Sequence, residues 1–475
     1  MRVDPPRAAP ATPHLHARDL ARRWLILAAS SLLLSGLLAL LLAAARTPFL
    51  DALVQDPLFF RRGLVVHVDL ALLVWIYACV AALFALVPAR RAPGPGARIS
   101  PAFGLAGVML LVVSAGTGGS QPILANYVPV IDHPLFLAGL GTFAFGVVLA
   151  FADRRLLPRA EAPHGVVDLP DAARVALRTA ALAVFAALLC FAGSWVSTSR
   201  RLSPEAYYEN LFWGGGHVLQ VASVAAMCGA WLLLLQPVAK REILSRRAAS
   251  LLFGALLLPA LGAPLLALQG PASPWYRIGF TRLMQWGIFP ATLVVMFACA
   301  AAAVRSRARL SDGRVVGFVT SAALTLLGFA LGAMIRGSNT MVPAHYHAAI
   351  GAVTASFMAA AYPILERLGI RIAWPGLARV QPAVFGAGQA IFALGFGIAG
   401  LFGMSRKVYG AEQLERSLPE SIGLAVMGAG GLVAAAGGIA FLTVFLVSWR
   451  RAAVREAAGR SEAWIPETGS TPSRS

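Results

Sequence analysis

The sequence has little charge: only 13% of its 475 residues are charged, while 58% are hydrophobic. Soluble proteins carry about 25% charged residues, so an ordinary soluble domain is excluded. Cysteine is also scarce, and the four cysteines stand singly in apolar segments, which indicates inert buried thiols rather than a metal site (Cys79, Cys190, Cys228 and Cys299). The sequence contains no CxxCH tract, no GxGxxG fingerprint and no P-loop. It therefore carries no covalent c-type haem and gives no sign of a nucleotide site.

The sequence consists largely of long apolar runs of about 20 residues or more. Each can cross a bilayer as a helix, the structure whose backbone satisfies its own hydrogen bonds in lipid. We therefore expect an all-α, polytopic membrane protein with twelve transmembrane helices. The predicted spans are 23–46, 63–88, 102–119, 134–152, 175–197, 212–236, 247–268, 279–304, 315–335, 342–365, 381–402 and 421–449. The polar ends predict a disordered cytoplasmic N-terminus at 1–20 and a cytoplasmic tail at 451–475, flanking one membrane domain at 21–450.

The net charge of +19 is distributed unevenly. Most Lys and Arg residues precede the first span or follow the even-numbered spans, as Arg90, Arg154 and Lys240 do. By the positive-inside rule, both termini are then cytoplasmic, in a bacterial inner membrane. The charge is thus a topology signal and predicts no nucleic-acid partner. The first span lacks a small-residue cleavage site, so we expect it to be retained.

Four of the eight histidines lie inside predicted spans. His345 and His347 begin the tenth span, and residues two apart on a helix point about 200° apart, so each can reach a different metal. His67 and His217 begin the second and sixth spans, which cross the membrane in the same direction, so all four imidazoles are predicted at one depth. Without paired thiolates or carboxylates, imidazole favours iron or copper over zinc.

Small residues accompany these histidines. Gly214–Gly216 precede His217, and Ala348, Ala349 and Gly351 follow His347. Glycine costs about 1 kcal/mol in a helix interior, so the run predicts that something bulky approaches the backbone; a flexible helix start is the alternative.

Other polar residues have two interpretations. His133 either caps a helix or bonds a haem propionate. Asp69 either serves a proton route or lies near the surface. The arginines beside these spans either hold haem propionates or extend to the membrane interface; they are Arg61, Arg62 and Arg336. No role is assigned to His14, His16 or His164.

These motifs resemble subunit I of the haem–copper oxidase superfamily, closest to the C-type cytochrome c oxidases and nitric oxide reductases. The resemblance covers about residues 20–450 and rests on His67 with Trp75, Trp213-Gly-Gly-Gly-His217, and His345-x-His347 with Gly351. It implies that His67 and His347 are the axial ligands of a low-spin haem b. It implies further that His345 is the proximal ligand of a high-spin haem that binds O2 or NO, and that His217 binds copper or a non-haem iron facing it. Electrons would come from a c-type cytochrome or a cupredoxin-like donor subunit.

The sequence departs from this family in its seventh span. The family supplies two adjacent histidines there for the second metal, but no histidine occurs between His217 and His345, and the expected pair falls near Ala263-Pro264. That span also lacks tyrosine, and the nearby Gln220 and Gln285 offer only amides, which are weak ligands. One imidazole is an incomplete site for copper or non-haem iron.

We therefore predict two b-type haems and a respiratory oxidoreductase that resembles cytochrome c oxidase or nitric oxide reductase. A non-catalytic di-haem protein that binds gas or transfers electrons is the alternative. A haem-free transporter is disfavoured, because its polar groups would lie near the bilayer midplane rather than near one surface.

Overall fold

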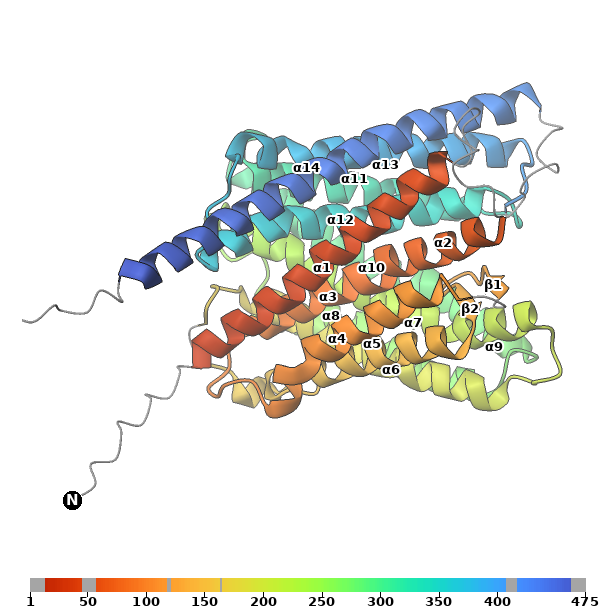
Figure 1. The fold of residues 1–475 in the computed structure, drawn as a ribbon, viewed down its shortest axis with the longest axis horizontal. Coiled ribbons are helices and arrows are strands. Elements are labelled where there is room, and N and C mark those ends of the chain that lie inside the picture. The colour runs from red at the N-terminus through yellow and green to blue at the C-terminus, as the bar shows by residue number, and fades with distance from the viewer. Residues whose placement is uncertain (1–12, 45–56, 118–120, 163–164, 407–416, 463–475) are drawn as a thin grey trace, which may run out of the picture.

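The computed structural model describes residues 13–44, 57–117, 121–162, 165–406 and 417–462. In these residues the chain forms long helices that lie side by side in one bundle (Figure 1). Within the described ranges, twelve helical segments are long and apolar enough to cross a membrane, and each coincides with one of the twelve predicted spans, which confirms that prediction.

Ten spans are single helices and two are interrupted by a π-helical segment. In chain order they are α1 (Pro13–Ala44), α2 (Pro57–Asp69) with η2 (Leu70–Val74) and α3 (Trp75–Ala85), α4 (Pro95–Ser114), α5 (Pro134–Phe151), α6 (Asp171–Ser197), α7 (Pro204–Leu235), α8 (Arg246–Leu268), α9 (Pro274–Arg282) with η5 (Leu283–Ile288) and α10 (Phe289–Arg305), α11 (Gly313–Ala333), α12 (Met341–Arg367), α13 (Pro375–Leu401) and α14 (Leu418–Glu462). Short 3₁₀ turns η3 (Arg154–Leu156) and η4 (Pro158–Ala160) follow α5.

The ends of the chain are more helical than predicted. The prediction of disorder across 1–20 is wrong for residues 13–20, because Ala17 and Leu20 are buried against the bundle and Arg18 donates a hydrogen bond to the carbonyl of Leu368. Residues 1–12 lie outside the described residues. In the predicted tail, α14 continues as a helix to Glu462.

A two-stranded antiparallel sheet adds to the helices that were predicted. Strand β1 (Gln121–Ile123) pairs with β2 (Val130–Asp132), and Gln121 is the partner of Asp132. The sheet lies at the end of the bundle opposite the start of α1 (Figure 1). Ile123, Val130 and Ile131 are buried, so this hairpin is packed onto the helices.

Three spans form the interior of the bundle. In the most apolar window of α2–α3, α7 and α12, 78%, 78% and 83% of residues are buried, against at most 61% in any other span. Small residues permit this close packing: a Cβ added to Gly317 of α11 would lie 2.2 Å from Cβ of Ala359 in α12. These three innermost spans carry all four intramembrane histidines.

Candidate functional site

His67 lies near the carboxyl end of α2, just before the π-helical segment η2. Its Nδ1 is 2.8 Å from the carbonyl oxygen of Ser35 in α1, and that contact makes Nδ1 the protonated, donating nitrogen. The Ser35 hydroxyl in turn lies 3.0 Å from the backbone carbonyl of His67. The imidazole is thus held in one orientation with Nε2 left over, and π-helical insertions often occur at functional sites.

His347 faces His67 across the interior. His67 is the nearby titratable side chain that acts on His347, and Gln389 of α13 is the side-chain hydrogen-bond partner of His347. The ring of Phe392 lies 4.4 Å from the His347 ring and that of Phe396 lies 6.0 Å away, centroid to centroid. The structure therefore brings together the two residues that the sequence assigned to one haem.

His345 points to a different neighbour. Its Nδ1 is 2.7 Å from the carbonyl oxygen of Gly328 in α11, whereas His347 contacts α13. The expectation that these two side chains leave the helix on different faces is confirmed. Gly332, one turn along α11, makes room for the ring, because a Cβ at this position would lie 2.8 Å from His345 Nδ1.

His217 is buried in α7 with both ring nitrogens engaged. Nδ1 lies 2.6 Å from the carbonyl of Trp213 and Nε2 lies 2.9 Å from the hydroxyl of Tyr127. A carbonyl only accepts, so Nδ1 donates to it and the Tyr127 hydroxyl donates to Nε2. Burial, the main cause, together with the nearby Glu209 carboxylate raises the pKa of Tyr127 well above its ordinary value despite the opposing Arg406, so this donor keeps its proton at pH 7.

The glycines before His217 make room for aromatic side chains. A Cβ at Gly216 would lie 2.3 Å from Tyr127, one at Gly215 would lie 2.2 Å from Phe191, and one at Gly214 would lie 2.7 Å from Phe280. The prediction that something bulky approaches this backbone is correct, and in the structure it is the protein itself.

The small residues after His347 serve helix packing. A Cβ at Gly351 would lie 3.3 Å from the Gln389 side chain, and one at Gly328 would lie 3.1 Å from the backbone nitrogen of Ala349. These contacts join α12 to α13 and α11. At these two positions other helices occupy the space beside the small residues.

Three of the four imidazoles suit haem iron. A histidine that ligates a metal usually donates its other ring N–H to a carbonyl or a similar acceptor, which fixes its tautomer. His67 and His345 do so through Nδ1, to Ser35 and Gly328 respectively, and His347 has a side-chain partner in Gln389. This donor set fits haem on two faces of α12.

A second metal beside the haem does not fit. Both nitrogens of His217 are used within the protein, and no hydrogen bond, ring contact or electrostatic interaction in the described part of the chain joins it to His345. No group of three His, Cys, Asp or Glu side chains able to hold a metal occurs among the described residues. In α8, where the family has its histidine pair, Ala263 is fully buried next to Pro264.

The remaining candidates divide between surface and interior. His133 caps α5, its Nδ1 accepting the Leu135 N–H at 3.2 Å, which confirms the capping interpretation. Asp69 is 0% exposed, so its carboxylate lies inside the bundle, and neither carboxylate oxygen has a hydrogen-bond partner among the described residues. Arg62 is buried, whereas Arg61 and Arg336 are exposed.

Comparison with known proteins places the chain. The sequence profile of the family described as Cytochrome C and Quinol oxidase polypeptide I matches residues 19–437. An uncharacterized protein of Aquifex aeolicus is 33% identical over 73% of this chain and 84% of its own length. An uncharacterized protein of Rickettsia prowazekii is 24% identical over 90% of this chain and 96% of its own. A solved heme-copper terminal oxidase dimer shares the fold, with a TM-score of 0.73 at 16% identity over 93% of this chain and 84% of that one.

Proposed function

Because the chain belongs to the family of cytochrome c and quinol oxidase polypeptide I, a multi-pass membrane family of respiratory oxidoreductases, we propose that it passes electrons through a low-spin haem b to a second, gas-binding haem. The observation that carries this proposal is the proximity of His67 and His347, which lie on two of the innermost spans.

Each haem-binding residue has a defined task in this proposal. His67 and His347 would ligate the low-spin iron, with Ser35 and Gln389 holding their rings and Phe392 excluding water. His345 would ligate the second iron from the opposite face of α12. When bound, the two haems supply one-electron transfer and one open iron position for O2 or NO.

Haem-binding residues held in this way need little reorganisation. The Gly328 carbonyl accepts the Nδ1 proton of His345 and so keeps Nε2 unprotonated and aimed away from α11. The absence of a side chain at Gly332 lets the ring sit against that helix. The Ser35 carbonyl holds Nδ1 of His67 in the same way, so the rings of His345 and His67 are both fixed in orientation.

His217 has a different task from the one the family pattern assigns. It is bonded through both nitrogens, so we assign it no metal and derive no step from one. Its partner, Tyr127, donates its hydroxyl proton to Nε2 and stays protonated at pH 7, so it fixes the orientation of the ring. The incomplete second site favours one further candidate function, a non-catalytic di-haem protein that binds gas or transfers electrons without turnover.

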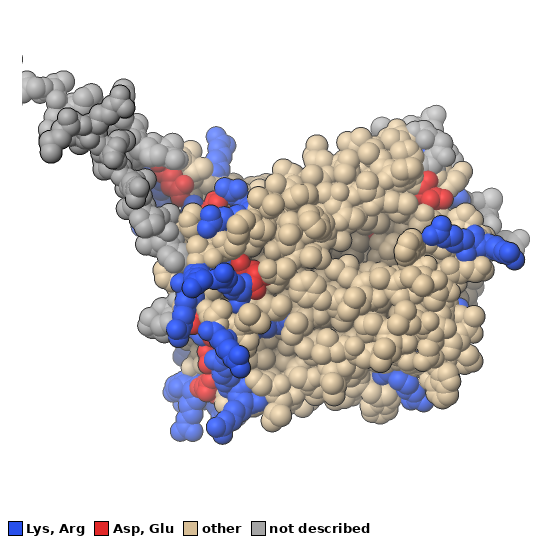
Figure 2. Space-filling model, turned by 90° about the horizontal axis from the view of Figure 1, so that it is seen from below, with Lys and Arg blue, Asp and Glu red and all other residues tan. Residues whose placement is uncertain are grey.

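We place the chain in a bacterial inner membrane with both termini in the cytoplasm. This proposal is supported by Figure 2, where Lys and Arg gather at one end of the bundle, the end that holds the loops after the even-numbered spans. The electron donor, a c-type cytochrome or a cupredoxin-like subunit, would dock at the opposite end, where β1 and β2 lie.

A reduced-minus-oxidised spectrum of the purified protein, with and without carbon monoxide, tests the proposal together with iron and copper analysis. We expect two b-type haems per chain, one of which binds carbon monoxide, and no stoichiometric copper. Turnover of O2 or NO by reduced cytochrome c would support the enzyme, and gas binding without turnover would support the non-catalytic alternative. A colourless protein from haem-replete cells would refute both.

A further inference from the structure

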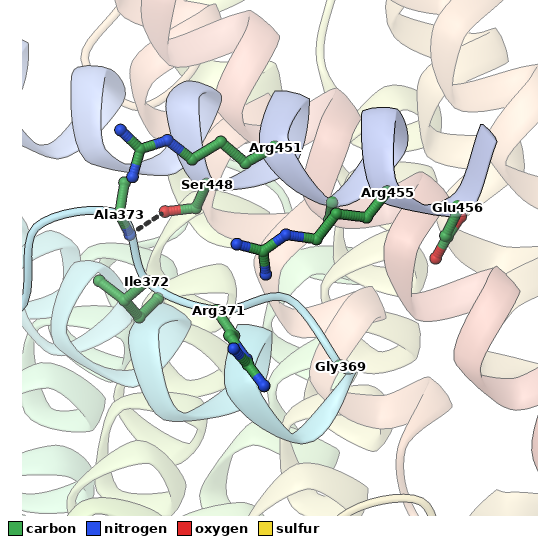
Figure 3. Close-up of a pocket in the computed structure, with 9 residues that line it drawn as sticks. Gly369, Arg371, Ile372, Ala373, Ser448, Arg451, Arg455 and Glu456 are labelled. Carbon is green, nitrogen blue, oxygen red and sulfur yellow. Dashed lines mark hydrogen bonds between the residues drawn. The ribbon is translucent and has the colours of Figure 1, made fainter. Parts of the chain in front are cut away.

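A cavity of about 210 Å³ opens at the basic end of the bundle, away from the histidines. It lies between the loop that follows α12 and the last turns of α14 (Figure 3). Its walls include Arg371, Ile372 and Ala373 from the loop, and Ser448, Arg451 and Arg455 from α14. None of these residues has a part in the proposed haem sites.

The charge of this cavity is positive and unbalanced. Among the described residues that line the cavity, the one acidic side chain is Glu456, which is paired with Arg22 of α1 at 3.1 Å. No ion pair or hydrogen bond from the described residues reaches the guanidinium groups of Arg371, Arg451 or Arg455. A guanidinium without an acid favours an anion that can accept its forked hydrogen bonds, and phosphate has that geometry.

Buried arginines at the same end of the bundle have acidic partners within the protein. Arg155 is 3% exposed and its guanidinium lies 2.7 Å from Asp153, while Arg178 is paired with Glu161 at 3.1 Å. The protein thus supplies its own acids where arginines are enclosed. The three arginines at the cavity are exposed instead, and their guanidinium groups are open to a ligand from outside.

The walls of the cavity are held in place by the fold. The hydroxyl of Ser448 accepts the Ala373 N–H at 2.9 Å, which ties the loop to α14. Gly369 turns the chain at the end of α12 with φ of +81°, and the Leu368 carbonyl beside it accepts a 2.9 Å hydrogen bond from Arg22. In Figure 3, Arg455 extends from α14 toward the loop that carries Arg371. The backbone segments that carry the cationic side chains are therefore held together before any ligand arrives.

The cavity lies at the level along the bundle where lipid headgroups are expected. The Arg451 guanidinium lies 5.7 Å from the ring of Trp374, and tryptophan is enriched where a protein crosses the membrane surface. On the apolar side of this level, Leu377 of α13 and Leu446 of α14 are exposed on the bundle surface, where acyl chains would cover them. The observed guanidinium groups thus lie beside an apolar surface, as a bound lipid requires.

We propose that this cavity binds the phosphate of an anionic phospholipid from the leaflet at the basic end of the bundle. The guanidinium groups of Arg371 and Arg455 hold the phosphate, Arg451 is held at the interface by Trp374, and the acyl chains lie along α13 and α14. The site is independent of the haem proposal, because it shares no residue with it.

Lipid binding to the purified haem-containing protein tests the proposal. Native mass spectrometry and calorimetry with short-chain phosphatidylglycerol, short-chain phosphatidylcholine and inorganic phosphate distinguish a lipid from a free anion. We expect phosphatidylglycerol to bind in preference to both other probes. In the R371Q+R455Q variant its affinity falls about tenfold or more, since each arginine near the surface contributes on the order of 1 kcal/mol to anionic lipid binding.

Two variants control for folding and for general charge. R371K+R455K keeps both charges but loses the forked hydrogen bonds, so its phosphatidylglycerol affinity should fall between that of the wild type and that of R371Q+R455Q. R305Q+R309Q removes two exposed arginines from the same end without touching the cavity and leaves the affinity unchanged. An unchanged size-exclusion profile and thermal melt in detergent show that each variant is folded. Equal losses in R371Q+R455Q and R305Q+R309Q, or inorganic phosphate binding as tightly as phosphatidylglycerol, would overturn the proposal.

Discussion

Replacing Gly332 with alanine tests whether His345 alone holds the gas-binding haem. The added Cβ would lie 2.8 Å from His345 Nδ1 and 3.0 Å from its Cε1, whereas ordinary contact begins at 3.4 Å. The ring must therefore retreat by roughly 0.6 Å at Nδ1, which strains its 2.7 Å hydrogen bond to the Gly328 carbonyl. Overpacking of this kind typically costs about 1–3 kcal/mol. The displacement of the ring also moves Nε2 away from the position in which it would bind the iron. His67 and His347 do not contact Gly332, so their haem stays.

The assay is the carbon monoxide difference spectrum, normalised to the low-spin signal of the same sample. We expect Gly332→Ala to lower the fraction of haem that binds carbon monoxide several-fold with little change at the low-spin haem. Gly438→Ala is the matched control, because nothing lies within 4 Å of its added Cβ. An unaltered carbon monoxide spectrum in Gly332→Ala, or loss of both haems together, would refute the assignment of His345.

Three further predictions address other parts of the molecule. His67→Ala should abolish the low-spin signal and leave the carbon monoxide complex, and spectra showing the reverse would mean that the ligand roles are exchanged. Tyr127→Phe leaves the buried Nε2 of His217 without a donor, so the free energy of unfolding in detergent should fall by about 1–3 kcal/mol with no change in bound metal. The control variant Phe289→Leu, at a residue 39% exposed, should lower it by less. Equal effects of the two variants would contradict a hydrogen-bonding role for Tyr127. Burial raises the pKa of Glu161, but the hydrogen bond from Arg174 and the charges of Arg178 and Arg246 outweigh it and hold the pKa below its ordinary value. The stability that Glu161 provides is therefore present above the ordinary pKa of a glutamate and is lost as pH falls through the lowered pKa. Thermal melts of wild type and Glu161→Gln should differ at pH 7 and converge in acid.

Helix positions were predictable because they depend on local composition. An apolar run long enough to cross the bilayer has few alternatives to a helix, so residues 247–268 and 342–365 already predicted α8 and α12. The opposite faces of His345 and His347 follow from helical geometry and were predicted for the same reason. The helical start at Pro13 was missed, because the polar residues around it gain their stability from contacts with α12, far away in sequence.

The partners of the histidines were not predictable from the sequence. Tyr127 lies in a loop between two short strands, 90 residues from His217, and no local pattern marks it as the donor to that ring. The groups that hold the other three rings are common ones. Ser35 contacts His67 through its hydroxyl and its backbone carbonyl, Gln389 contacts His347 through its side-chain amide, and Gly328 contacts His345 through its backbone carbonyl. Any helix could supply such groups. The glycines before His217 signalled a bulky neighbour, but only the structure identified it as aromatic side chains.

The sequence alone determined the membrane class, the twelve spans, the family resemblance and the absence of a helix 7 histidine pair, because each depends on composition or on residues close together in the chain. Tertiary structure decided which spans form the interior, that His67 meets His347, that Tyr127 occupies the free nitrogen of His217, and that three arginines line one cavity. These features depend on contacts between distant segments, whose free energy is set by how the helices pack against one another.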